Sequence, residues 1–338
     1  MQTSLKFLWL AVAGAVVVGL VGWVGLLLWF TLPAGETIRT ILAVGYGAVA
    51  AGGLLFSLGR RRFTPFLLLL VGGFVAALMW WSTIEPRNDR DWPLDVARLT
   101  SAEIDGDLVQ LRNIRDFVYR TETDYTPRWY DKTVDLRKLD SLDLIAVHWM
   151  GDAIARTFLS FGFEGEQVAI SIETRKQENE AYSALAGFFR RYELYYVVAD
   201  EKDLIGLRTT YRDPNEDVYL YKVRIPKEKI RQLFLQYAVT VDGLSKQPAF
   251  YNTATTYWTT NIVTNVQAIA GEVPFSWKIL FSGYFAELMY ERGALDQSLP
   301  FAQLRQKSYI NKRSQAATSA ADYSRQIRQG LPGYANRP

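Results

Sequence analysis

Cysteine is absent from this chain of 338 residues, and histidine occurs once, as His148. The lack of cysteine excludes disulfides, thiolate metal sites and a cysteine nucleophile. A single histidine argues against a histidine-rich metal site. The net charge of +3 is small and the two signs are interleaved, which argues against nucleic-acid binding. The sequence also lacks a glycine-rich phosphate loop and a serine nucleophile elbow, so we expect no metal and no cofactor.

Three long apolar runs occupy the first quarter of the chain. We expect membrane-spanning helices over about residues 7–30, 39–58 and 63–84, because roughly 20 apolar residues cross a bilayer. The first run is longer than the core of a cleaved signal peptide, and two further runs follow it. Residues 1–84 are therefore predicted to form a retained three-helix anchor.

Basic and aromatic residues predict the orientation of this anchor. Arg60, Arg61 and Arg62 lie between the second and third runs, and the positive-inside rule places them and the amino terminus in the cytoplasm. Trp80 and Trp81 suit an interfacial anchor at the far end of the third helix. Everything that follows is then expected to lie outside the cytoplasm.

The apolar runs carry no charge in their cores, which argues against a transporter or a proton relay. Small residues recur there at helical spacing: Ala15, Gly19, Ala43, Gly47 and Ala51. This spacing allows close helix packing, either among the three helices or with a partner membrane protein. Membrane lipids and membrane-protein partners are the expected contacts.

The rest of the chain reads as one domain with flanking segments. We expect a linker and domain entry over residues 85–107, a domain over residues 108–312, and a polar strap or loose tail over residues 313–338. Strands are expected at 166–174, 192–200, 205–211 and 217–225, and helices at 226–248 and 254–270. Strands followed by helices predict an α+β fold. The charged run at 200–203 resembles a solvated turn.

Six stretches of this domain, in one order along the chain, carry a family resemblance. They are NIRDFVYRTETDYTPRWYDKTVDL, IARTFLSFGF, AISIETRK, YSALAGFFRRYELYYVVADEKDLIGLRT, DVYLYKV and PAFYNTATTYWTTNI. The region from about Leu108 to Pro332 resembles the Lnb N-terminal periplasmic domain family of the bacterial lipoprotein N-acyltransferase type. The resemblance implies a rearranged papain-like α+β fold, a place on the periplasmic side of the bacterial inner membrane, and a catalytic histidine and cysteine in that order.

Both members of this catalytic pair are replaced. Arg156 stands where the family has histidine, while Tyr257 and Trp258 stand where it has asparagine and cysteine. Arginine stays protonated and cannot act as a general base, and an indole cannot attack an acyl group. His148 does not align with the catalytic position, and an ordinary hydrogen-bonded histidine is the simpler interpretation. The sequence therefore predicts a pseudoenzyme without catalytic residues.

The degenerate site is expected to form a cleft between the replaced positions. Its predicted lining residues are Arg156, Glu173, Tyr251, Asn252, Tyr257, Trp258, Thr259 and Asn261. We expect the Arg156 guanidinium to stack on the Trp258 indole, and Glu173 to form an ion pair with Arg175. For the aromatic members, core packing is the favoured interpretation over a role in lining a ligand site.

Three functions follow from these patterns. The first is a catalytically inactive scaffold or accessory subunit of a larger membrane protein complex. The second is a lipid-binding or lipoprotein-binding protein that uses the degenerate cleft. The third is an active acyltransferase or hydrolase with a different nucleophile, for which Glu173, Thr259 and Thr260 are the candidate groups.

Overall fold

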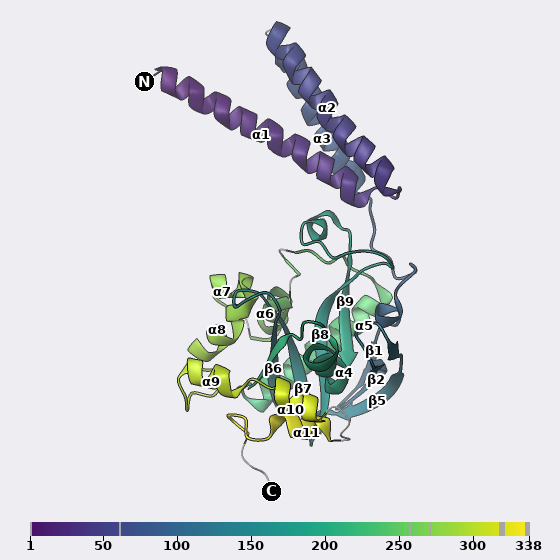
Figure 1. Ribbon diagram of the computed structural model, residues 1–338, viewed down its shortest axis with the longest axis vertical. Coiled ribbons are helices and arrows are strands. Elements are labelled where there is room, and N and C mark those ends of the chain that lie inside the picture. Colours follow the sequence, from purple (N-terminus) through teal and green to yellow (C-terminus); the bar gives the residue numbers. More distant parts are fainter. Residues whose placement is uncertain are drawn as a thin grey trace. The chain divides into compact units, whose positions relative to one another are not determined.

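A computed structural model describes residues 2–60, 62–253, 255–256, 258–270, 272–317 and 322–334 (Figure 1). The chain divides into two compact units. One contains residues 1–87 together with residues 182–192, and we call it the helical unit. The other contains residues 88–181 and 193–338, and we call it the sheet domain.

The helical unit is built on three helices, α1 (Gln2–Thr31), α2 (Glu36–Arg60) and α3 (Thr64–Ser82). Each is long and apolar enough to cross a membrane, which confirms the three predicted apolar helices. Helix α2 approaches α3 closely, since a Cβ on Gly53 would lie 3.1 Å from the Phe66 ring. Ala15 and Gly19 of the small-residue pattern are exposed in this unit, so its helix packing does not use them.

The sheet domain contains ten strands. They are β1 (Ser101–Asp105), β2 (Leu108–Arg115), β3 (Val118–Tyr119), β4 (Tyr125–Thr126), β5 (Trp129–Asp135), β6 (Leu139–His148), β7 (Ala155–Phe163), β8 (Glu166–Arg175), β9 (Glu193–Ala199) and β10 (Asp217–Lys222). The main sheet has the order β1-β2-β9-β8-β7-β6-β10, and β5 pairs with β2. All its pairings are antiparallel except the short contact between β2 and β9. Strands β3 and β4 form a separate hairpin.

Helices and helical turns cover the sheet. They are α4 (Glu201–Gly206), continued by the π-helical turn η4 (Leu207–Tyr211), then α5 (Lys227–Lys246), α6 (Trp258–Ala270), α7 (Trp277–Leu280), η5 (Ser282–Tyr284), α8 (Phe285–Glu291), α9 (Phe301–Lys307), α10 (Asn311–Ala317) and α11 (Tyr323–Arg328). Two shorter turns, η1 (Leu94–Val96) and η2 (Leu136–Lys138), lie in the connections. The observed mixture of sheet and helices confirms the predicted mixed α/β domain.

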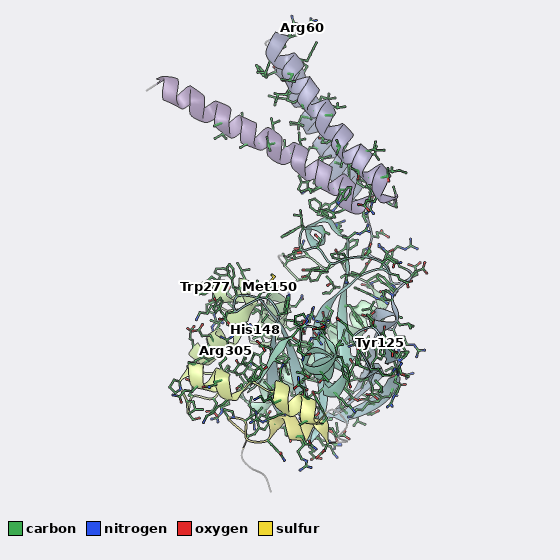
Figure 2. The ribbon with its side chains drawn as sticks, viewed as in Figure 1. Arg60, Tyr125, His148, Met150, Trp277 and Arg305 are labelled. Atoms are coloured by element: carbon green, nitrogen blue, oxygen red, sulfur yellow. The ribbon has the colours of Figure 1, made fainter. Side chains whose placement is uncertain are left out.

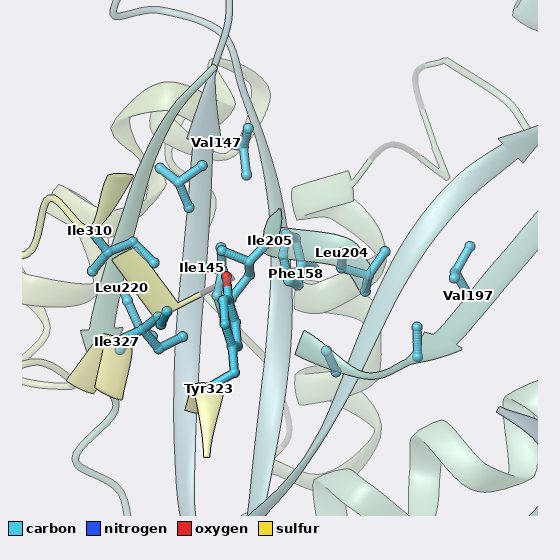
Figure 3. Close-up of a cluster of buried hydrophobic side chains, with 14 of the residues drawn as sticks. Ile145, Val147, Phe158, Val197, Leu204, Ile205, Leu220, Ile310, Tyr323 and Ile327 are labelled. Atoms are coloured by element: carbon cyan, nitrogen blue, oxygen red, sulfur yellow. The ribbon is translucent and has the colours of Figure 1, made fainter. Parts of the chain in front are cut away.

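Alternation along the strands divides the core into two layers. One face packs against α4, α10 and α11 through a cluster of buried side chains that includes Ile145, Phe158, Val197, Leu204 and Ile327 (Figure 3). On the other face, Phe234 of α5 lies 5.1 Å from both Phe161 and Phe163, measured between ring centroids. We call the first the α4 face and the second the α5 face.

The strand predicted at residues 205–211 is wrong, because this segment is helical from α4 into η4. The physical reason lies just before it. Asp200 stands at the helix start with Glu201 and Asp203 in the first turn, where the helix dipole favours negative charge. The expected solvated turn at 200–203 is also wrong, since Glu201 is 1% exposed and Asp203 is fully buried.

The ends of the sheet domain differ from the expected boundaries. The domain begins at Asn88, and β1 lies inside the predicted linker. Strand β1 is an edge strand whose side chains are largely exposed, so its sequence carries little apolar alternation. The described residues 322–334 form a strap, because Tyr323 and Ile327 are buried in the core cluster.

A buried ion cluster ties this strap to the sheet. Arg328 of α11 donates to the Asp143 carboxylate of β6 at 2.7 Å and to Glu201 Oε2 of α4 at 2.7 Å. Both carboxylate side chains have no exposed surface. Two buried acids therefore depend on one guanidinium for their counter-charge.

Replacing Arg328 by alanine is expected to destabilise the sheet domain by about 3 to 5 kcal/mol, because two buried carboxylates lose their partner. Chemical unfolding in detergent micelles, followed by tryptophan fluorescence, measures this loss. Arg325→Ala is the matched control on the same helix, since the Arg325 side chain is 70% exposed in its pair with Asp322. Equal effects of the two variants would contradict the assigned role of Arg328.

Candidate functional site

Arg156, which the sequence resemblance aligns with the family's histidine, is the second residue of β7. The pairing of β7 with β8 places Leu159 opposite Ile170, and continuing that register puts Arg156 opposite Glu173. Arg156 Nε lies 3.3 Å from Glu173 Oε2, and both side chains are largely buried. The structure thus brings two predicted cleft residues together as an ion pair on the α4 face.

Glu173 is shared with other partners. Its Oε1 accepts hydrogen bonds from Ser171 Oγ at 2.8 Å and from Arg208 Nη2 at 3.1 Å. Burial acts to raise the pKa of Glu173, but Arg156 and Arg208 more than offset this and hold the pKa below its usual range. The carboxylate is therefore ionised at neutral pH and is a weak base.

Arg208 extends this pair into a chain of alternating charges. Its Nε lies 3.7 Å from Glu216 Oε2, and Glu216 also pairs with Arg212. Arg212 Nε lies 3.2 Å from Glu122 Oε1. Burial and the charge of Arg156 lower the pKa of Arg208 to about 9, which leaves the guanidinium protonated at neutral pH.

The predicted ion pair between Glu173 and Arg175 is wrong. Arg175 instead donates to the carbonyl oxygens of Val96 and Ala97, each at 3.0 Å, and its guanidinium lies 4.1 Å from the Trp92 ring centroid. Glu173 meets nearer cations from the adjacent strand and from η4. Arg175 is the last residue of β8, and its partners Val96 and Ala97 belong to the segment that precedes β1.

The predicted stacking of Arg156 on Trp258 lies outside the described residues, because the Trp258 side chain and Tyr257 are not among them. The aromatic contact that the structure describes for Arg156 is with Trp149, whose ring centroid is 5.6 Å from the guanidinium carbon. Trp149 follows β6 at the start of the β6–β7 connection. Its position near Arg156 was not predicted from the sequence.

Helix α6 carries the other half of the predicted site, and three of its polar side chains, Thr259, Asn261 and Asn265, are buried. Thr259 is fully buried and donates its hydroxyl to the carbonyl oxygen of Ile279. Asn261 is 7% exposed. Asn265, further along the helix, donates to the Tyr196 hydroxyl at 3.2 Å on the α5 face. The Thr259 hydroxyl is therefore shielded from any substrate in solution.

Tyr251 and Asn252 precede α6 and serve local structure. Tyr251 is 1% exposed, as the alternative of core packing requires. The Asn252 side-chain Oδ1 accepts a hydrogen bond from the Thr255 backbone N–H at 3.2 Å. The backbone carbonyl oxygen of Asn252 accepts one from the Thr256 N–H at 2.9 Å. These bonds form a turn that leads into the helix.

His148 lies at the end of β6 and is 7% exposed. Its Nδ1 is 3.4 Å from the Gly151 carbonyl oxygen, and its ring contacts Tyr219 edge-on. Burial and the nearby Arg305 lower the pKa of His148, so the ring is neutral at physiological pH. These contacts fit a structural histidine.

Sequence reasoning missed Arg208, Arg212 and Glu216 as parts of the site. Arg208 lies in η4, whereas Arg212 and Glu216 follow the end of η4 at Tyr211, so no helical spacing marked the three residues together. The strand expected at 205–211 also gave Arg208 the wrong local structure. Only the corrected helix brings Arg208 onto Glu173.

An open pocket of about 640 Å³ lies apart from these residues. It is lined by Arg98, Asp116, Pro127, Arg128, Trp129, Tyr130 and Asp200. The Tyr130 hydroxyl donates to Asp200 Oδ1 at 2.7 Å. Burial raises the pKa of Asp200 to about 6, although the bond from Tyr130 opposes that rise.

This raised pKa makes the stability of the sheet domain dependent on pH. An unfolded aspartate titrates near about pH 4, so between about pH 4 and pH 6 the folded state holds a proton that the unfolded chain has released. The free energy of unfolding is therefore expected to fall by about 2 kcal/mol as the pH rises through this window. Asp200→Asn should remove that slope in unfolding curves measured from pH 4 to 7. Asp105→Asn, at an exposed position, should keep it, and equal slopes in both variants would contradict the assignment.

Comparison with known proteins agrees with the resemblance seen in the sequence. Residues 125–283 match the family model described as the Lnb N-terminal periplasmic domain, which confirms the predicted family resemblance. This segment includes Arg156, Glu173 and the beginning of α6. No curated protein and no solved structure matches the chain. The similarity of this chain to the Lnb N-terminal periplasmic domain family therefore extends over residues 125–283.

Proposed function

We propose that this protein is a membrane-anchored pseudoenzyme that acts as a scaffold or accessory subunit of a membrane protein complex. It would lie in the bacterial inner membrane with its amino terminus in the cytoplasm and its sheet domain in the periplasm. The observation that carries the proposal is the ion pair of Arg156 with Glu173. A permanent cation occupies the position at which the family's papain-like chemistry places its base, and a carboxylate holds it there.

The described alternatives for catalysis lack the required geometry. A hydroxyl nucleophile needs an adjacent base and access to substrate. Thr259 is fully buried and already donates to a backbone carbonyl. Glu173 has a lowered pKa and three neighbouring donors, so it is a poor base. These features support a binding role over turnover.

An exposed apolar surface supports the same role. Six large side chains, each between 40% and 77% exposed, form what we call the apolar patch: Trp149, Met150, Phe275, Trp277, Leu280 and Phe281. Figure 2 labels Met150 and Trp277 of this group. Large exposed apolar patches commonly mark interaction sites.

Two segments contribute the patch, and close backbone contacts hold them together. The Gly283 N–H donates to the Ala153 carbonyl at 3.1 Å, and the Ser282 hydroxyl accepts from the Ala155 N–H at 3.0 Å. A Cβ on Gly283 would lie 1.9 Å from the Asp152 carbonyl oxygen, so glycine is required there. Since Trp149 also lies over Arg156, the patch adjoins the degenerate site.

The lipid-binding alternative draws on the same patch, because aromatic and aliphatic side chains also accept an acyl chain. Because the chain has no cysteine, a single introduced cysteine can distinguish the scaffold function from the lipid-binding function. Trp277→Cys carrying a photoactivatable cross-linker is expected to capture a membrane protein when irradiated in native membranes. Gentle solubilisation and mass spectrometry then identify the adducts.

Val239→Cys on α5 is the matched control, since Val239 is 56% exposed and Trp277 is 51% exposed. Protein adducts found at 277 and absent at 239 support the scaffold. Adducts with lipid alone would favour the lipid-binding function, and equal labelling at both sites would remove the patch as an interaction surface.

The pseudoenzyme is also expected to show no turnover of an acylated peptide above the uncatalysed rate, because the Thr259 hydroxyl is buried and Glu173 is held ionised as a weak base. Mass spectrometry of the peptide with purified protein measures this directly. Should turnover appear, Thr260→Ala and Thr264→Ala distinguish its source. Loss of activity only in the Thr260 variant would establish a threonine enzyme and refute the proposal.

A further inference from the structure

The segment Tyr182–Tyr192 connects β8 and β9 of the sheet domain, yet it belongs to the helical unit. We call it the interface loop. Its sequence is YSALAGFFRRY, and it contains the short helical turn η3 (Ala186–Phe189). The chain therefore leaves the sheet domain after Ala181, contributes to the helical unit, and returns at Glu193.

Phe189 anchors this loop among the aromatic side chains of the helices. It is 3% exposed, and its ring centroid lies 5.8 Å from that of Trp23 and 5.7 Å from that of Phe30. Trp23 in turn contacts Phe74 at 5.2 Å and Trp81 at 5.9 Å. The loop thus joins an aromatic cluster made by α1 and α3.

These contacts also indicate depth along the helix axis. Trp23 and Phe30 are seven residues apart, or about 10 Å at the rise of an α-helix. Phe189 touches both, so it lies beside the last two turns of α1, which ends at Thr31. The apolar segment Ala11–Thr31 is about as long as the hydrocarbon core is thick. Phe189 therefore lies roughly 5 Å inside the carboxyl end of the span, at the depth of interfacial membrane segments.

Two consecutive arginines bind the carboxyl ends of the same helices. Arg190 Nη1 donates to the carbonyl oxygens of Trp81, at 2.9 Å, and Ile84, at 3.1 Å, and its guanidinium lies 4.2 Å from the Trp81 ring centroid. Arg191 Nη1 donates to the Phe30 carbonyl at 3.1 Å. Carbonyls at a helix end have no partner within the helix and carry the negative end of its dipole. The loop caps α3 and α1 at once.

The opposite side of the loop is apolar and exposed. Tyr182, Leu185 and Phe188 are 42%, 45% and 42% exposed, although Phe188 is the direct neighbour of the buried Phe189. These side chains belong to the same compact unit as three helices that are apolar enough to lie in lipid. A bilayer is the environment that matches both the chemistry and the depth of these side chains.

We propose that the interface loop is a fourth membrane element, which does not span the bilayer but inserts Tyr182, Leu185 and Phe188 among the phospholipids at its outer boundary. Arg190 and Arg191 hold the loop at that depth through the helix ends. The sheet domain is then joined to the membrane by three stretches of chain, at residues 87–88, 181–182 and 192–193, instead of one.

The absence of cysteine makes the depth of the loop measurable in the full chain. Single variants Phe188→Cys, Val49→Cys and Thr133→Cys carry a spin label in nanodiscs of phosphatidylcholine and phosphatidylglycerol. Val49 is 71% exposed in the middle of α2, so its label gives the accessibility expected in lipid. Thr133 is exposed on β5, so its label gives the accessibility expected in water. Accessibility to oxygen and to a water-soluble nickel chelate is then compared.

We expect the ratio of oxygen to nickel accessibility at Phe188 to exceed that at Thr133 by at least about twofold, and to lie below that at Val49. A ratio equal to that at Thr133 would overturn the proposal, because the loop would be in water. A label shielded from both reagents would also overturn it, since protein and not lipid would then cover this face.

A second variant tests the arginine caps. Arg190→Ala, introduced into the labelled Phe188→Cys chain, is expected to raise nickel accessibility by about twofold or more as the loop leaves the interface. Arg190→Lys should retain part of the effect, and Arg128→Ala, at an exposed ion pair of the sheet domain, should change nothing. Unchanged accessibility in Arg190→Ala would refute the role of the arginine.

Discussion

A guanidinium or carboxylate that leaves water must be paired, and the position of the α4–η4 segment depends on that requirement. Asp203 accepts a bidentate bond from Arg115 of β2, at 3.0 and 2.6 Å. Glu201, two residues earlier, accepts from Arg328 of α11. Buried ion pairs thus connect α4 to strand β2 and to helix α11. The same segment continues into η4, whose Arg208 contacts Glu173 on the α4 face.

A third ion pair of the α4–η4 segment involves Glu173, a residue of the candidate site. Arg208 of η4 pairs with Glu173, so that carboxylate has a cationic partner even before Arg156 is considered. The family's histidine is therefore not needed to neutralise Glu173 or to hold β8 against η4. In the function that we propose, a permanent cation at the position of the family's histidine is compatible with this network, because Arg156 then has a buried carboxylate as its partner.

Features that rest on local pattern were predictable from the sequence, and features that rest on distant partners were not. The apolar helices, strands β8, β9 and β10, and helix α5 each carry their own periodicity. The burial of Asp203 and Glu201 depends on Arg115 and Arg328, which lie 88 and 127 residues away. Without knowledge of those partners, the acidic residues at 200–203 are predicted to be exposed to solvent. The pairing of Arg156 with Glu173 similarly required the register of β7 against β8.

In the helical unit, arginine side chains are paired with backbone carbonyl oxygens and not with carboxylates. Carbonyls in the last turn of a helix lack the usual donor four residues further along, so a donor from another segment stabilises the ends of α1 and α3. Arg191 and Arg190 supply those donors from a loop that starts and ends in the sheet domain. In the function that we propose, the sheet domain binds a partner and does not turn over substrate, and the proposed insertion of the interface loop adds a contact with lipid to those of the three apolar helices. Both proposals assign to the chain the task of presenting a binding surface at the membrane.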